Sequence, residues 1–172
     1  MTTYFVGFLT PLKAFDKFIP EGFTLVPVER RHLTLVYLGE RVRVDELREK
    51  LEALPPIRPF RATFRGLAAF PSMSKARYLA VVPTAESASL LQSLRDEVVG
   101  ILQEHRDRYS VFKPHVSIAR TRLKPSLELY KRVAKAVRAS SLVSETLELR
   151  ELFLMEAEAG EVRPLYKLSL RG

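Results

Sequence analysis

Two segments, HLTLVYL at residues 32–38 and HVSIA at residues 115–119, set the architecture of this chain. Each begins with a histidine, an apolar residue, a hydroxyl residue and a second apolar residue. Side chains on a strand alternate between its two faces. The histidine and the hydroxyl of each segment therefore share one face, and the apolar residues pack in a core on the other. The pattern predicts two strands that present the same pair of polar groups.

Similar units surround the two segments, each a strand, a short loop, a helix and a further strand. We expect helices from Asp45 to about Leu54, from Thr84 to about Glu104, and from Pro125-Ser126 onward. The inward residues are expected to include Leu90 in the second helix, and Tyr130, Val133, Ala134 and Val137 in the third. Strands are expected at 4–9, 32–38, 60–69, 78–82, 115–119, 147–156 and 165–170. The sequence predicts one α+β domain over residues 1–172, with a faint internal repeat that suggests two lobes about a pseudo-two-fold axis.

The composition narrows the classes of function. The 172 residues carry a formal net charge of +8 and contain no cysteine, which excludes disulfides, thiolate chemistry and Cys-ligated metals. The basic excess favours an anionic partner, with nucleic acid first. No apolar run is as long as a membrane span, and the start lacks the pattern of a signal peptide, so we expect a cytoplasmic protein with no membrane association. The absence of asparagine is typical of a thermophile.

The paired polar groups suit the cleavage of a phosphodiester. In-line displacement needs a base on one side of phosphorus and an acid on the other, and imidazole serves as either near neutral pH. His32 and His115 are the candidates, and the hydroxyls of Thr34 and Ser117 can bind non-bridging oxygens. His105 is expected to be a solvated residue at a helix end. The sequence shows no convincing set of metal ligands. Basic residues flank both segments, at Arg30, Arg31, Lys113, Arg120, Arg122 and Lys124.

The two segments resemble the signature of the two-histidine (2H) phosphoesterase superfamily, a pair of His-x-Thr/Ser-x motifs 83 positions apart in this chain. The resemblance is closer to the branch called RNA 2′,3′-cyclic phosphodiesterase or 2′-5′ RNA ligase, through residues 29–40 and 112–120. It covers essentially the whole chain. It implies a bilobal fold with two antiparallel sheets flanked by helices and a central cleft. It also implies hydrolysis of a terminal 2′,3′-cyclic phosphate on RNA to a 2′-phosphate, with no metal and no cofactor.

The resemblance also implies roles for individual residues. His32 and His115 match the acid–base pair, Thr34 and Ser117 the phosphate-binding hydroxyls, and Arg120 an arginine that contacts the phosphate. We expect His32 to be the acid for the 3′ oxygen and His115 to be the base for water. Strict strand alternation aims Arg120 away from the cleft, whereas the resemblance places it inside.

Base recognition is less clear from the sequence. Phe8, Phe70 and Tyr78 are candidates for stacking on a base. Leu25 and Ala80 stand where relatives often carry an aromatic residue and a tryptophan, and the segment 11–28 shows little helical pattern. These departures concern recognition of the base rather than the chemistry.

Three alternatives stay open on the sequence alone. The first is a 2′-5′ RNA ligase that joins tRNA halves, so that tRNA fragments are candidate partners. The second is a cyclic phosphodiesterase that acts on a small molecule. The third is a non-catalytic RNA-binding module, which the charge of +8 motivates. A monomer is expected in each case.

Overall fold

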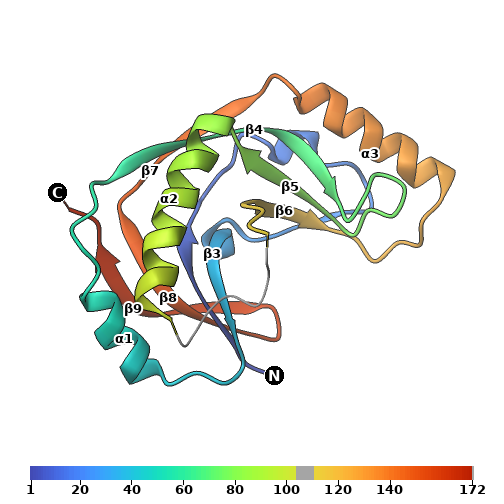
Figure 1. The fold of residues 1–172 in the computed structure, drawn as a ribbon. Helices are drawn as coiled ribbons and strands as arrows, with labels where there is room; N and C mark the ends of the chain where they lie inside the picture. The colour runs from blue at the N-terminus through green and yellow to red at the C-terminus, as the bar shows by residue number, and fades with distance from the viewer. Residues whose placement is uncertain (104–110, 172) are drawn as a thin grey trace.

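The computed structural model describes residues 1–103 and 111–171, and His105 lies outside these residues. The described chain contains three α-helices, two short 3₁₀ helices and nine strands (Figure 1). The helices are α1 (Val44–Glu52), α2 (Ala85–Ile101) and α3 (Leu127–Ser140), and the 3₁₀ helices are η1 (Asp16–Phe18) and η2 (Val28–Arg30). The strands are β1 (Thr3–Leu9), β2 (Thr24–Leu25), β3 (His32–Gly39), β4 (Phe60–Phe70), β5 (Tyr78–Pro83), β6 (Val116–Arg120), β7 (Ser144–Leu149), β8 (Glu151–Glu158) and β9 (Glu161–Ser169).

The strands form one antiparallel sheet in the order β7-β4-β5-β6-β3-β1-β8-β9, and β2 pairs with β6. The sheet has two halves, one of β7, β4, β5 and β6 with the short β2, the other of β3, β1, β8 and β9, which correspond to the two sheets expected from the resemblance. A single residue pair, Leu33 with Val116, joins the halves through β3 and β6. The α+β class and the antiparallel architecture are therefore as predicted, and the two sheets are continuous at their centre.

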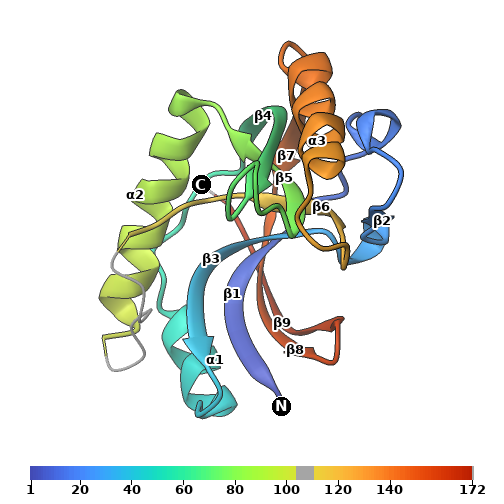
Figure 2. The same cartoon turned by 90° about the vertical axis from the view of Figure 1, so that its right-hand side faces the viewer.

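Helix α3 packs on one half of the sheet, whereas α2 spans both halves. Helix α3 packs against β4, whereas α2 packs against β3, β4 and β5, and α1 packs against α2 and β9. Figure 1 shows α2 crossing the face of the sheet, and Figure 2 shows β1 and β3 running side by side, with α2 to their left. Within residues 1–103 and 111–171, no helix is long and apolar enough to cross a membrane.

Most helix starts follow the local sequence. Thr84 occupies the N-cap position of α2, and the Ser126 hydroxyl accepts a hydrogen bond from the Leu129 amide at the start of α3 (3.0 Å). Asp45 lies in the first turn of α1 rather than at its cap, which is Arg43.

Three details of the sequence prediction are wrong. Leu90 and Tyr130 are 44% and 41% exposed, because they lie outside the buried stripes of their helices, which include Leu91 in α2 and Leu129 in α3. The expected strand at 147–156 is two strands, β7 and β8, which are separated at Arg150 and pair with β4 and β1 respectively.

A buried arginine holds the irregular segment between β1 and β3. Arg31 is 1% exposed, and its guanidinium binds both carboxylate oxygens of Asp16 at 2.6 and 3.2 Å. It also donates to the carbonyl oxygens of Leu12 and Val26. A buried charge needs such partners to offset its lost hydration. These bonds fix residues 12–26 beside the start of β3, where they form one wall of the site described below.

Candidate functional site

The two histidine segments are neighbours at the centre of the sheet. Leu33 of β3 pairs with Val116 of β6 in antiparallel fashion. Antiparallel pairing about this contact brings His32 towards Ser117 and His115 towards Thr34. The predicted juxtaposition of the two motifs therefore follows from the sheet register.

Burial along both strands follows the predicted alternation. Leu33, Leu35, Val116 and Ile118 are fully buried. By contrast, the two histidines and their hydroxyl partners, Thr34 and Ser117, are only partly buried. The core holds the strands through one face, and the polar groups remain accessible on the other.

A bulge follows each motif and breaks the alternation at equivalent positions. Leu79 and Ala80 of β5 pair with Ala119 and Ser117 of β6, so Ile118, which lies between these two, has no partner in β5. An extra residue of this kind moves the following side chains to the opposite face. Arg120 thereby returns to the face of His115 and Ser117, which resolves the conflict between strict alternation and the resemblance in favour of the cleft.

The bulge in β3 has the same position relative to its histidine. Val6 pairs with Val36 and Gly7 with Thr34, so Leu35 is left without a partner. Tyr37 consequently occupies, in the first motif, the place of Arg120 in the second. Tyr37 could not be singled out from the sequence, because a bulge leaves no local mark in an apolar run.

Both imidazoles are anchored in the same way. His32 Nδ1 lies 2.9 Å from the carbonyl oxygen of Arg30, and His115 Nδ1 lies 2.8 Å from that of Lys113. A carbonyl oxygen only accepts hydrogen bonds, so each Nδ1 carries the proton in the neutral ring. The Nε2 atom of each ring is then free to accept a proton, or to donate one when the ring is charged.

Aromatic rings pack against both histidines. Phe5 lies against His32 with a ring-centre distance of 4.8 Å. His115 stacks with Phe70 at 5.4 Å and with Tyr78 at 6.1 Å. These contacts restrict the orientation of both imidazoles.

One of the three aromatic residues predicted to stack on a base does not fit that role. Phe8 is 1% exposed and packs edge-on against Phe60 in the core, so no base can reach its ring. Phe70 and Tyr78 are partly exposed and stack on each other at 5.5 Å beside His115. Their stacking on a base stays a prediction.

Burial lowers the pKa of His32 below its ordinary value of 6.5. The hydrogen bond to Arg30 opposes this shift, and the positive charges of Arg120 and His115 add to it. Arg120 and His115 therefore lie close enough to act on the charge of His32. Neutral His32 is therefore favoured in the free protein.

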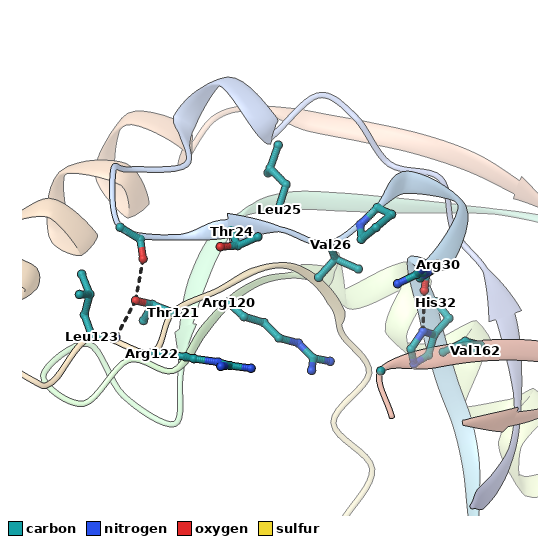
Figure 3. A pocket seen from close by; sticks show the side chains of 13 residues that line it. Thr24, Leu25, Val26, Arg30, His32, Arg120, Thr121, Arg122, Leu123 and Val162 are labelled. Atoms are coloured by element: carbon teal, nitrogen blue, oxygen red, sulfur yellow. Dashed lines mark hydrogen bonds between the residues drawn. The ribbon is translucent and has the colours of Figure 1, made fainter. Parts of the chain in front are cut away.

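An open pocket of about 660 Å³ adjoins His32 (Figure 3). The segment 22–27 forms one wall, the end of β6 and the residues after it form a second, and the β8–β9 hairpin tip contributes Gly160 and Val162. Figure 3 shows Arg120 and Arg122 extending in parallel into this space, with His32 across from them. His115 is not among the lining residues, so the pocket extends from the histidine pair on the side of His32.

Sequence reasoning missed much of this pocket. The wall at 22–27 and the hairpin tip are distant from both motifs in the chain, and neither carries a recognisable motif. From the sequence, Arg122 is only one member of a basic cluster beside the second motif. Among the described residues, no group of three or more histidine, cysteine, aspartate or glutamate side chains is placed to hold a metal ion.

Residues 13–161 match the model of the 2′-5′ RNA ligase superfamily. The chain belongs to this family. It is 28% identical over 151 residues to a protein of Archaeoglobus fulgidus named RNA 2′,3′-cyclic phosphodiesterase, and the match covers 85% of this chain and 81% of that protein. It is also 35% identical over 109 residues to a protein of the same name from Thermus thermophilus. That second match covers 58% of this chain and only 54% of its relative.

Solved structures share the fold of this family member. TT0787 of Thermus thermophilus superposes with a TM-score of 0.67 at 23% identity, over 99% of this chain and 98% of that one. LigT of Escherichia coli, complexed with NADP⁺, superposes with a TM-score of 0.63 at 18% identity, again over 99% and 98%. These likenesses show that the chain has the fold of these two proteins over nearly its whole length.

Proposed function

We propose that this chain hydrolyses terminal 2′,3′-cyclic phosphates on RNA to 2′-phosphates, by acid–base catalysis with His32 and His115 and without a metal ion. The observation that supports the proposal most strongly is the matched pair of imidazoles. They come from adjacent central strands, and each is held through Nδ1 by a backbone carbonyl. The names of the Archaeoglobus and Thermus relatives point to the same activity.

The proposed reaction is an in-line displacement at phosphorus. One imidazole takes a proton from water through Nε2 while the water oxygen bonds to phosphorus. The bond from phosphorus to the 3′ oxygen breaks, and the other imidazolium gives its proton to that oxygen. The product has a 2′-phosphate and a 3′-hydroxyl. In this proposal Thr34 and Ser117 donate hydrogen bonds to the non-bridging oxygens, and Arg120 balances their charge.

The order of acid and base depends on His32. The resemblance assigns it as the acid, whereas its lowered pKa favours the neutral ring and therefore the base. Replacing each histidine and recording kcat/KM against pH separates the two assignments. A variant that has lost its base loses the acidic limb of the profile, and one that has lost its acid loses the basic limb.

The first experiment is product analysis with adenosine 2′,3′-cyclic phosphate in excess EDTA. We expect 2′-AMP as the product. His32→Asn and His115→Asn should each lower the rate by at least about 10²-fold. The asparagine amide can still donate to the carbonyl that holds Nδ1, so the loss reports the missing Nε2 rather than a disturbed strand. Loss of activity in EDTA, or equal turnover by the double variant, contradicts the proposal.

The family match gives a second candidate, joining RNA ends through a 2′-5′ linkage. The same two imidazoles would serve, because an attacking 5′-hydroxyl replaces water. Split tRNA halves with a cyclic phosphate and a 5′-hydroxyl separate the two reactions. Hydrolysis alone at every RNA concentration excludes ligation.

A further inference from the structure

The pocket beside His32 contains paired and unpaired positive charges. Arg30 lines it but forms an ion pair with Glu161 at the β8–β9 hairpin (2.7 Å). Arg120 and Arg122 also line it, and neither has an acidic partner within residues 1–103 and 111–171. Two unpaired guanidiniums that point into one cavity are suited to bind anionic groups.

The backbone between these two arginines is fixed. Thr121 is 7% exposed, and its amide donates to the carbonyl oxygen of Arg77 at 2.9 Å. Its hydroxyl donates to the carbonyl oxygen of Gly22 at 2.7 Å and accepts from the Leu123 amide at 3.1 Å. Because Thr121 is held on the inner side, its two neighbours lie on the other side, where Figure 3 shows both in the pocket.

We propose that Arg122 binds a second phosphate, the one on the 5′ oxygen of the terminal nucleoside. This inference rests on the proposed function, in which Arg120 holds the cyclic phosphate. Two residues of extended chain separate the arginines, about 6.6 Å, which is comparable to the spacing of successive phosphates along a nucleic-acid strand.

The apolar lining of the pocket suits the nucleoside that connects the two phosphates. Val26, Pro27 and Val162 also line the pocket, and they offer apolar surface to a ribose or base. Figure 3 shows the Val26 side chain directed into the pocket. The site thereby distinguishes an RNA end, which carries both phosphates, from a simple cyclic nucleotide, which carries one.

Three substrates test the proposal: adenosine 2′,3′-cyclic phosphate, the same compound with a 5′-phosphate, and the dinucleotide ApA ending in a 2′,3′-cyclic phosphate. The second and third should each have a higher kcat/KM than the first. Arg122→Ala should reduce this advantage about tenfold, and Arg122→Lys should retain part of it as a point charge. Arg61→Ala removes the same charge from an exposed position on β4 and should leave the advantage intact.

Two outcomes would overturn the assignment of Arg122 to the second phosphate. An advantage for the dinucleotide alone means that the second nucleoside, and not the phosphate, is recognised. An equal loss on all three substrates in Arg122→Ala means that the arginine acts on the cyclic phosphate or on the fold.

A binding measurement is independent of turnover. In the double histidine-to-asparagine background, the affinity for a short single-stranded RNA with a cyclic phosphate end is measured against salt concentration. Removing one phosphate contact should lower the slope of log affinity against log salt by about 0.7. An unchanged slope in Arg122→Ala refutes the second phosphate site. If no substrate is turned over but the slope falls, the catalytic proposal fails and the binding site stands.

Discussion

Gly7 offers a sharp test of how the first histidine segment is held. A Cβ added at Gly7 of β1 would lie 2.2 Å from the backbone oxygen of Leu33, the residue after His32. Ordinary van der Waals contact begins near 3.4 Å, so β1 and β3 would have to separate by roughly 1 Å or more. Both strands are central in the sheet, and Leu33 also carries the pair with Val116. The strands therefore have little room to move apart.

We expect Gly7→Ala to cost about 1–3 kcal/mol of unfolding free energy, as overpacking does elsewhere. For a domain of this size, this corresponds to a fall in Tm of about 2–12 °C. Urea unfolding gives the free energy, and activity on a cyclic nucleotide reports whether His32 has moved. The matched control is Gly100→Ala on α2, where an added Cβ meets no atom of the described residues within 4 Å.

The control should shift stability in the opposite direction. Gly100 is exposed near the end of a helix, so alanine should stabilise the protein by up to about 1 kcal/mol. If Gly7→Ala is as stable as the unmodified protein, or if both variants move the same way, the close approach of β1 to Leu33 does not constrain the sheet as argued.

Three further predictions concern the surroundings of the site. Because the pKa of His32 is lowered in the folded state, the unfolded chain binds more protons than the folded protein below pH 6.5. The free energy of unfolding should therefore fall as the pH drops from 6.5 through the pKa of the folded state. His32→Asn should reduce this dependence in unfolding curves recorded at several pH values. Asp16→Asn leaves the buried Arg31 without its countercharge and should cost about 2–4 kcal/mol in chemical denaturation; unchanged stability would show that the two carbonyl acceptors suffice. Replacing Phe70 or Tyr78 by leucine should weaken RNA binding by about 1–3 kcal/mol if these rings stack on a base, and equal affinity in a titration would assign them only to the support of His115.

The parts of the structure that follow a regular period were predictable from the sequence. The alternation of Leu33 and Leu35 with His32 and Thr34 is visible in the chain and holds in the structure. The α+β class follows from the order of such segments, and Ser126 marks the start of its helix through an ordinary cap.

The errors arise where long-range contacts override the local pattern. The sequence of residues 147–156 is typical of a single strand. Nothing local shows that its first part pairs with β4 and its second part with β1, in different halves of the sheet. From the sequence, Phe8 is a candidate for stacking on a base. In the structure it is buried against Phe60, which lies 52 positions away in the chain. A side chain's own chemistry does not indicate which distant segment will pack on it.

The pocket was the least predictable part. Its walls come from residues 22–27, from the chain after β6 and from the β8–β9 hairpin, and only the fold brings these together. Arg31 is an instructive case, since it looks like one more surface cation beside a motif. It is instead buried, and it binds Asp16 and the carbonyl oxygens of Leu12 and Val26, which precede it by 5 to 19 positions.

The twin bulges have a consequence for aligning related chains. Each motif has a histidine, a hydroxyl residue two positions later and a third polar residue three positions after that. Because side chains on a flat strand alternate, this spacing places all three on one face only if the strand contains a bulge. Straightening β6 without shortening it would rotate the guanidinium of Arg120 towards the hydrophobic interior, although every residue of the motif would be unchanged. A relative with a flat strand at this point keeps its arginine in the cleft only if the chain is one residue shorter there. A gap at Ile118 is then the correct alignment, and an ungapped one misassigns the arginine even when both histidines are matched.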